Sequence, residues 1–168
     1  MYGLTRTPKI GLVAFGGSVP QPTDGADLAA TSIGQGRVLL SPLGLATVAA
    51  AVDTGTVRAP LLVDGAPDDS VATSQLPPAV VSALHEMMAS VVASGTAAGQ
   101  GLPAGTYAKT GTAQYGTSAP LKTDAWLMGF NGKVAFAALV VDSDGNGGPT
   151  CGPIVAKFLD ALTGAGAG

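Results

Sequence analysis

The sequence predicts an α+β fold in which an antiparallel sheet is flanked by helices. Two strand-like runs, at residues 125–130 and 133–142, are separated by Asn131-Gly132, which is a strong signal for a two-residue β-hairpin with a type I′ turn. Apolar residues between positions 80 and 92 recur with a period of about 3.6 residues, as on the packed face of a helix. A hairpin and an amphipathic helix in one chain favour helices layered on a sheet.

The first half of the chain gives weaker signals for regular structure. Residues 1–36 are rich in glycine, proline and polar residues, so we expect irregular backbone there, with one short strand at 10–15. A second short strand is expected at 58–63. The acidic residues of 64–70 then indicate a solvated loop.

Two helices are predicted from their end signals. Ser41 and Pro42 have the residue types of an N-cap and a first helical position, and Gly55 is a typical helix end. The second helix begins at Pro77-Pro78 and ends at Gly95. Its buried face is predicted to hold Leu84, Met88 and Val91.

The second half of the chain completes the predicted layers. Residues 105–113 are short and β-favouring, and we expect them to neighbour the hairpin as a third antiparallel strand. Apolar residues within 153–162 fall on one helical face, which predicts a closing helix.

The composition limits the possible partners and cofactors. A net charge of −3 without a basic cluster argues against a nucleic-acid partner. The single cysteine, Cys151, excludes an internal disulfide and is expected to be a small packing residue. The single histidine, His85, excludes a histidine-rich metal site and is expected on the solvated side of its helix. We therefore expect no metal and no organic cofactor.

The surface is expected to be poor in charge. Charged residues make up 11% of the chain, against about a quarter in typical soluble domains. This composition is understandable if part of the surface packs against another segment of protein. A general bias towards alanine and glycine explains it equally well. The sequence contains no run of about 18 apolar residues and no N-terminal signal pattern.

One short motif carries the chemistry of the chain. Lys109-Thr110-Gly111-Thr112 reads K-T-G-T, and K-T-G is one of three active-site motifs of penicillin-binding transpeptidases and serine β-lactamases. The other two are S-x-x-K, which carries the nucleophile, and S-x-N. No lysine here has a serine three residues before it, and neither asparagine has a serine two residues before it.

The segments around K-T-G-T strengthen the resemblance. S-I-G-Q-G at 32–36 with S-P-L at 41–43, and V-V-A-S-G-T-A at 91–97, are similar to segments of class B penicillin-binding proteins. D-A-W-L-M-G-F at 124–130 is similar to their H-A-W-F-x-G strand, with Asp124 in place of histidine and Leu127 in place of an aromatic residue. The chain thus resembles the class B penicillin-binding D,D-transpeptidases.

The resemblance implies a partial unit of a known fold. Residues 1–168 would be the C-terminal portion of the transpeptidase domain, without its S-x-x-K and S-x-N segments. The family fold, shared with serine β-lactamases, is an antiparallel sheet with helices on both sides. The implied partners are a peptidoglycan stem peptide ending in D-Ala-D-Ala, β-lactam antibiotics, and the N-terminal part of the domain. The family is anchored at the cytoplasmic membrane and faces the cell wall.

The resemblance also assigns roles to the motif residues. Lys109 would place a positive charge beside the nucleophile, and the backbone N–H of Thr112 would be an oxyanion donor. Gly111 would keep the strand bare for an extended substrate, whose carboxylate the hydroxyls of Thr110 and Thr112 would bind. In a regular strand, however, Lys109 and Thr112 point to opposite faces. Gln35, between two glycines, has no role beyond a turn that packs behind the site.

Two other interpretations stay open. The chain also fits part of a serine β-lactamase or D,D-carboxypeptidase, although S-I-G-Q-G followed by S-P-L favours the transpeptidase. It also fits a non-catalytic product, such as a truncated gene or one half of a split protein, because the serine motifs are missing.

Overall fold

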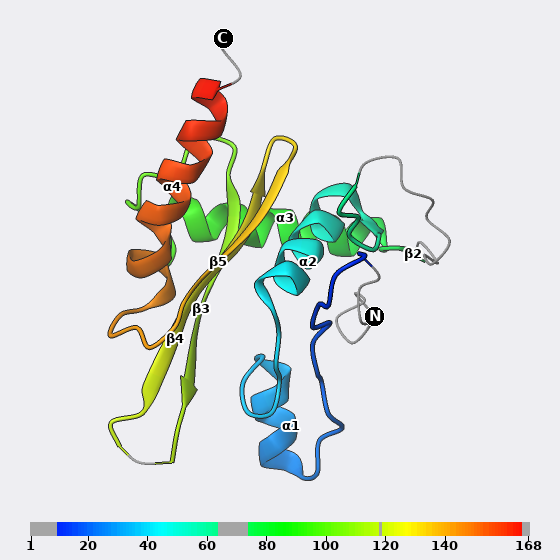
Figure 1. Ribbon diagram of the computed structural model, residues 1–168, viewed down its shortest axis with the longest axis vertical. Coiled ribbons are helices and arrows are strands. Elements are labelled where there is room, and N and C mark those ends of the chain that lie inside the picture. Colours follow the sequence, from blue (N-terminus) through cyan, green and yellow to red (C-terminus); the bar gives the residue numbers. More distant parts are fainter. Residues whose placement is uncertain (1–9, 64–73, 118, 166–168) are drawn as a thin grey trace.

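The fold is built on a three-stranded antiparallel sheet (Figure 1). The computed structural model describes residues 10–63, 74–117 and 119–165. Strands β3 (Tyr107–Tyr115), β4 (Lys122–Asn131) and β5 (Val134–Val140) lie in the order β3-β4-β5. The predicted strand and hairpin are confirmed, and so is the antiparallel pairing of all three strands.

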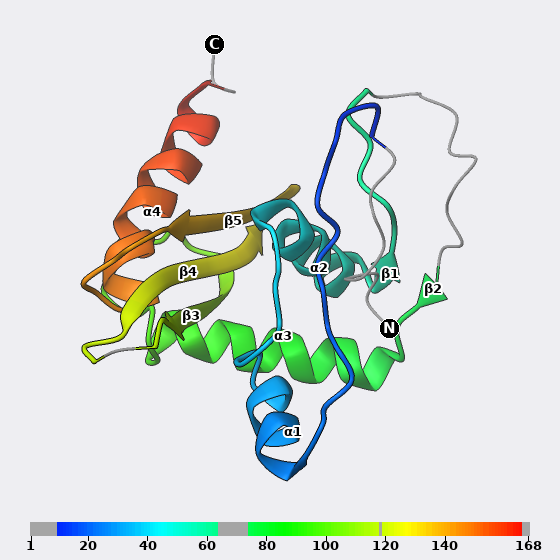
Figure 2. The same ribbon diagram turned by 60° about the horizontal axis from the view of Figure 1, so that its bottom comes forward.

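Helices cover both faces of this sheet. Helix α4 (Gly147–Ala165) packs on one face, and helices α2 (Pro42–Thr54) and α3 (Pro78–Ala93) pack on the other. Figure 2 shows the sheet between α4 and α3. The layered α+β prediction is therefore confirmed.

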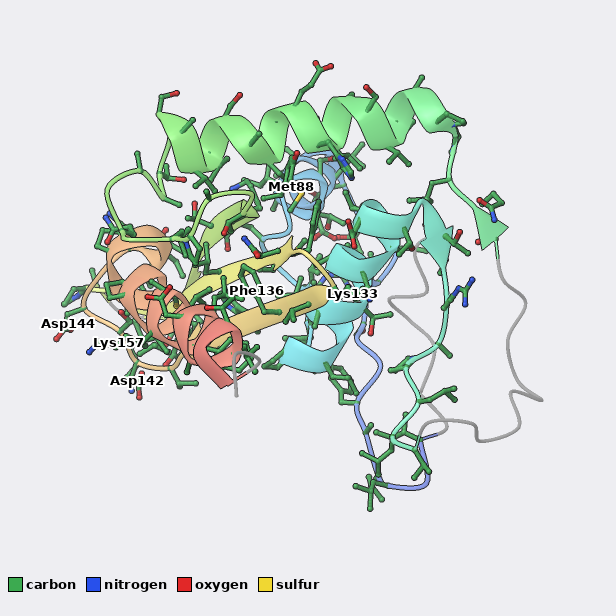
Figure 3. All side chains as sticks on the ribbon, turned by 90° about the horizontal axis from the view of Figure 1, so that it is seen from above. Met88, Lys133, Phe136, Asp142, Asp144 and Lys157 are labelled. Carbon is green, nitrogen blue, oxygen red and sulfur yellow. The ribbon has the colours of Figure 1, made fainter. Side chains whose placement is uncertain are left out.

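Each face of the sheet has its own core. On the α4 side the buried residues are Ala97, Ala108, Ala125, Leu127, Phe136, Cys151, Val155 and Leu159. On the other side they are Val52, Met88 and Phe130. Cys151 is fully buried, as predicted. Met88 lies between α3 and the sheet (Figure 3) and is 5% exposed, whereas Leu84 and Val91 are only partly buried.

The turn between β4 and β5 lies one residue later than predicted. Asn131 is the last residue of β4 and pairs with Val134, so Gly132 and Lys133 form the two-residue loop. Gly132 has a φ of 56°, and the positive φ at the first loop residue alone is the pattern of a type II′ turn. The Asn131 side chain donates instead to the Ala104 carbonyl at 3.0 Å, which ties the approach to β3 to the hairpin.

The helix ends follow from identifiable residues. The Ser41 hydroxyl accepts from the Gly44 N–H and caps α2, and Gly55 ends that helix with a φ of 68°. Helix α4 begins at Gly147, six residues before the predicted start at Pro153, which lies inside the helix. The prediction placed proline in the first turn, but Gly147 brings the true first turn close to the backbone of the sheet.

Several predictions for the first half were wrong. Residues 25–32 form a helix, α1 (Gly25–Ser32), which was not predicted. No strand forms at 10–15 or at 58–63. Instead β1 (Thr56–Val57) pairs with β2 (Ser74–Gln75) in a separate small sheet. The predicted acidic loop at 64–70 lies outside the described residues.

No helix within the described residues is long and apolar enough to cross a membrane.

Candidate functional site

The K-T-G-T motif lies in the middle of strand β3. Lys109 is exposed, while its neighbours Ala108 and Thr110 are buried, at 0% and 9% exposure. Lys109 pairs across the sheet with Met128, which packs with the core under α2 and α3. The lysine side chain therefore leaves the strand on the α2 and α3 face, and the alternating threonines leave it on the α4 face.

Both threonine hydroxyls have partners on the α4 face. Thr110 Oγ1 is 2.5 Å from Thr96 Oγ1, so the two hydroxyls share a hydrogen bond. Thr112 Oγ1 accepts a hydrogen bond of 3.3 Å from the Gly147 N–H, at the first turn of α4. The motif thus has a cationic face and a hydroxyl face.

The outer edge of β3, away from β4, presents backbone groups. No strand of the described part of the chain pairs with this edge. The Lys109 ammonium donates to the Thr110 carbonyl at 2.5 Å, and the Gln35 side chain donates to the Thr112 carbonyl at 3.0 Å. In an antiparallel strand the N–H and C=O of one residue point to the same side. The Thr112 N–H therefore points to this edge as well.

Gly111 leaves one face of the strand without a side chain at its position. A Cβ at this position would lie 3.4 Å from Cβ of Trp126, its partner across the sheet. Trp126 is only partly buried. Gly111 is itself partly buried and adds no side chain between Lys109 and Thr112, which suits the close approach of an extended ligand to the strand backbone.

Two residues of the site were missed by sequence reasoning. Gln35 contacts β3 through its amide, and Thr96 contacts it through its hydroxyl. Both lie in segments that resemble family blocks, at 32–36 and 91–97, but the sequence alone gave neither a partner. The blocks were the available signal, because each brings one polar side chain to the motif strand.

His85 is partly buried between α3 and its neighbours and is not on a fully solvated helix face, which corrects the prediction. Its Nε2 is 3.0 Å from the Val52 carbonyl, linking α3 to α2. Its ring packs at 5.2 Å from Tyr107 and 5.1 Å from Phe130, measured between ring centroids. His85 therefore supports the strand that carries Lys109 and takes no visible part in the site.

A polar cluster closes the far end of β3. The Tyr115 hydroxyl donates to the Asp142 carboxylate, which also forms a 3.1 Å ion pair with Lys122. The hydrogen bond from Tyr115 lowers the pKa of Asp142 and raises the pKa of Tyr115 to about 12. In Figure 3, Asp142 and Asp144 lie at the end of the sheet opposite Lys133. Within the described residues, no group of His, Cys, Asp and Glu could hold a metal ion.

This geometry supplies an anion-stabilising edge for an extended ligand. Lys109 and Gln35 occupy the outward carbonyls of Thr110 and Thr112, so an extended ligand beside this edge would meet the Thr112 N–H as its backbone donor. The Lys109 ammonium at the same edge favours developing negative charge. The S-x-x-K pattern of a lysine-activated serine does not occur in the chain.

Comparison with known proteins identifies the family. The penicillin binding protein transpeptidase domain family matches residues 2–160. The peptidoglycan D,D-transpeptidase PbpA of Mycolicibacterium smegmatis is 34% identical over 177 residues, covering 94% of this chain and 35% of that relative. The chain thus spans about a third of the length of this relative.

Solved structures agree with this assignment. PBPA from Mycobacterium tuberculosis has a TM-score of 0.73 at 33% identity. The match covers 95% of this chain and 43% of the PBPA chain. Its imipenem acyl-enzyme complex has a TM-score of 0.71 at 31% identity, with 96% and 40% covered. PBP2 from Helicobacter pylori, solved with MreC, has a TM-score of 0.80 at 23% identity, with 99% and 34% covered, and shows the fold alone. The predicted family and fold are confirmed.

Proposed function

This chain belongs to the transpeptidase-domain family of class B penicillin-binding proteins, and on that premise we propose that it forms the substrate-binding edge of a D,D-transpeptidase site. Residues 1–168 act as the C-terminal portion of that domain. The observation that carries the proposal is the outer edge of β3, which no strand of the described residues pairs with. Lys109 donates to the Thr110 carbonyl there, and the Thr112 N–H points to the same edge.

In the proposed reaction, a serine of the remaining domain attacks the carbonyl of the D-Ala-D-Ala bond. The electrons of the broken C–N bond and one proton leave with D-Ala, and an acyl-serine remains. An amine of a neighbouring stem peptide then attacks this ester, forms the cross-link and releases the serine. A β-lactam follows the first step, because its ring amide is opened by the same serine. With a peptidoglycan stem peptide as the proposed substrate, the proposed location of the site is the outer side of the cytoplasmic membrane, facing the cell wall.

Each motif residue has a distinct part in this proposal. The Thr112 N–H donates to the oxyanion, and Lys109 stabilises the negative charge of the tetrahedral intermediate. Gly111 lets the extended substrate lie against the strand. The hydroxyls of Thr110 and Thr112 bind the terminal carboxylate, which requires them to exchange their present partners, Thr96 and Gly147.

The two alternative functions differ in what happens to penicillin. A serine β-lactamase hydrolyses its penicilloyl-enzyme quickly, so free penicilloic acid accumulates. A D,D-carboxypeptidase keeps a penicillin adduct but passes its peptide acyl group to water and not to an amine. A transpeptidase keeps a long-lived adduct. A non-catalytic truncated or split product forms no adduct under any condition. S-I-G-Q-G at 32–36 with S-P-L at 41–43 favours the transpeptidase, because this pair of segments resembles class B penicillin-binding proteins.

A chimera tests the proposal. The matched region of the Mycolicibacterium smegmatis PbpA is replaced by this chain, and the product is labelled with a fluorescent penicillin. We expect a stable adduct, and we expect Lys109→Ala to lower the labelling rate by about 100-fold or more, as for loss of an oxyanion-stabilising group. Lys133→Ala, an exposed lysine in the β4–β5 turn, is the matched control. Equal labelling of both variants would contradict the role of Lys109.

A further inference from the structure

One side chain far from the motif in sequence binds the motif strand directly. Gln35 Nε2 donates to the Thr112 carbonyl at 3.0 Å, across a separation of 77 residues, in a partly buried position. Thr112 is the residue whose N–H is proposed to bind the oxyanion. Gln35 therefore contacts the same residue, on the same edge of β3, that the reaction would use.

The backbone around Gln35 is fixed by a helix-ending motif. The Gln35 N–H donates to the Ala30 carbonyl at 2.9 Å, and the Gly34 N–H donates to the Thr31 carbonyl at 3.0 Å. With Gly34 at a φ of 77°, these two bonds form a Schellman motif at the end of α1. The side chain of Gln35 thus leaves a constrained position and does not belong to a free loop.

A second anchor lies two residues further along. Arg37 forms a 2.5 Å ion pair with Asp27 of α1 and donates to the Gln21 carbonyl at 2.7 Å. Gly36, between Gln35 and Arg37, has a φ of 72°. Hydrogen bonds therefore fix the backbone before Gln35 and the Arg37 side chain after it. The Gln35 carboxamide contacts β3 from a preorganised turn.

We propose that Gln35 is a positioning residue of the transpeptidase site, which fixes the outer edge of β3 so that the Thr112 N–H stays directed at the oxyanion position. This inference rests on the proposed function. An edge strand has partners on one side only, so its outward peptide groups lack the hydrogen bonds that would fix their orientation from the other side. By holding the outward carbonyl of Thr112, Gln35 restrains the orientation of the outward N–H of the same residue.

The proposal depends on the donor and not on the size of the side chain. Gln35→Glu keeps the shape but places a carboxylate against the Thr112 carbonyl, so two acceptors face each other. Gln35→Lys retains a long N–H donor. The matched control is Gln100→Glu, because the Gln100 side chain also donates to a backbone carbonyl, that of Ala98, at 3.3 Å and within its own loop.

The first measurement uses the 168-residue chain itself. Hydrogen exchange of the peptide covering β3 is followed by mass spectrometry in all four proteins. Loss of one hydrogen bond, worth about 1 kcal/mol, should make β3 exchange about fivefold faster in Gln35→Glu. Gln35→Lys and Gln100→Glu should match the parent at β3. Unchanged exchange of β3 in Gln35→Glu would overturn the proposal.

The second measurement uses the PbpA chimera. Gln35→Glu should lower the acylation rate at saturating penicillin by about tenfold, as expected for a weakened oxyanion contact. The concentration giving half-maximal rate should change less, because binding uses the whole edge. Gln35→Lys should restore most of the rate. If the parent chimera labels and Gln35→Glu labels equally fast, the inference fails alone. If the parent chimera does not label, the proposed function fails, and the exchange of β3 still decides the role of Gln35.

Discussion

At the scale of single residues, the K-T-G-T motif of strand β3 directs side chains to both faces of the sheet. Lys109 leaves the strand on the α2 and α3 side, whereas the Thr110 and Thr112 hydroxyls meet Thr96 and Gly147 on the α4 side. Backbone groups point outward between them. A ligand beside β3 would therefore meet the ammonium and the peptide groups first, and the hydroxyls after they exchange partners.

Gly147 is the residue whose replacement should disturb this arrangement most directly. A Cβ there would lie 2.3 Å from the Trp126 carbonyl and 2.4 Å from the Gly111 carbonyl, and both are backbone atoms that cannot move easily. We expect Gly147→Ala to lower the free energy of unfolding by about 1–3 kcal/mol, as in overpacked cores. Urea denaturation followed by circular dichroism measures it.

Gly25→Ala is the control for this prediction. A Cβ at Gly25, in the first turn of α1, meets no atom within 4 Å. Its effect on the free energy of unfolding should stay within about 0.5 kcal/mol. Equal effects of the two variants would contradict the close packing of α4 on the motif strand.

The sequence predicted the motif and the faces to which its side chains point, but not the side chains that contact it. K-T-G-T and its alternation predicted that Lys109 and Thr112 face opposite ways, and the structure confirms this. The partners Gln35 and Thr96 could not be predicted, because a contact across 77 residues depends on the path of the whole chain. The position of His85 was predicted wrongly for a related reason. A single polar residue on a helix does not indicate that it will bind a backbone carbonyl of another helix.

At the scale of elements, two neighbouring methionines on α3 test which face of the helix is packed. Met88 is 5% exposed and Met87 is 57% exposed. Met88→Ala should lower the free energy of unfolding by about 2–5 kcal/mol, because it leaves a cavity between α3 and the sheet. Met87→Ala should change it by less than about 0.5 kcal/mol. Thermal and urea unfolding of both variants compare the two positions; equal losses would mean that the packed face is wrongly assigned.

The elements that were predicted correctly are those that bury a regular face. Helix α3 has strong periodicity because one side of it contacts the core, and the β4–β5 hairpin is marked by an Asn-Gly turn signal between two apolar runs. Helix α1 was missed because none of its eight residues is buried, so no apolar period marks it. The strand expected at 58–63 has apolar residues but no partner strand among the residues that the structure describes. Apolar runs alone do not distinguish a strand from an extended surface segment.

The anchoring of α1 should depend on acidic pH. Arg37 and the Thr23 N–H lower the pKa of Asp27 from its ordinary value of 3.8 to about 2. A lowered pKa in the folded state means that ionised Asp27 stabilises the fold above about pH 4, and that this stabilisation is lost as the pH falls towards 2. Urea unfolding between pH 5 and 2 should therefore show a smaller pH dependence in Asp27→Asn than in the parent.

Asp160→Asn, on the exposed side of α4, is the control for this effect. The pH dependence of that variant should follow the parent. A parent and an Asp27→Asn variant with the same pH dependence would contradict the ion pair with Arg37.

At the scale of the whole molecule, the 168-residue chain alone should form no covalent adduct with penicillin. Ring opening needs an activated nucleophile, and no serine here has a lysine one helical turn behind it. Thr106, three residues before Lys109, does not substitute, because its hydroxyl donates to the Pro103 carbonyl and accepts from Asn131. Intact-mass measurement after incubation with penicillin tests this.

A stoichiometric adduct on the chain alone would contradict this expectation. The modified residue, located by peptide mapping, would then be the nucleophile. The PbpA chimera is the positive control, because it restores the S-x-x-K and S-x-N segments. Weak, reversible binding by the chain alone agrees with a site that supplies charge and hydrogen-bond donors only.

The open edge of β3 also has a consequence for solubility. An unpaired strand is a template for the edge of a second molecule, which leads to aggregation unless the edge is blocked. Here the Lys109 ammonium and the Gln35 amide already occupy the outward carbonyls of Thr110 and Thr112. Self-association of two such edges would bring two ammonium groups together and break both contacts. We therefore expect the groups proposed to serve catalysis also to disfavour edge-to-edge pairing of two copies of this protein.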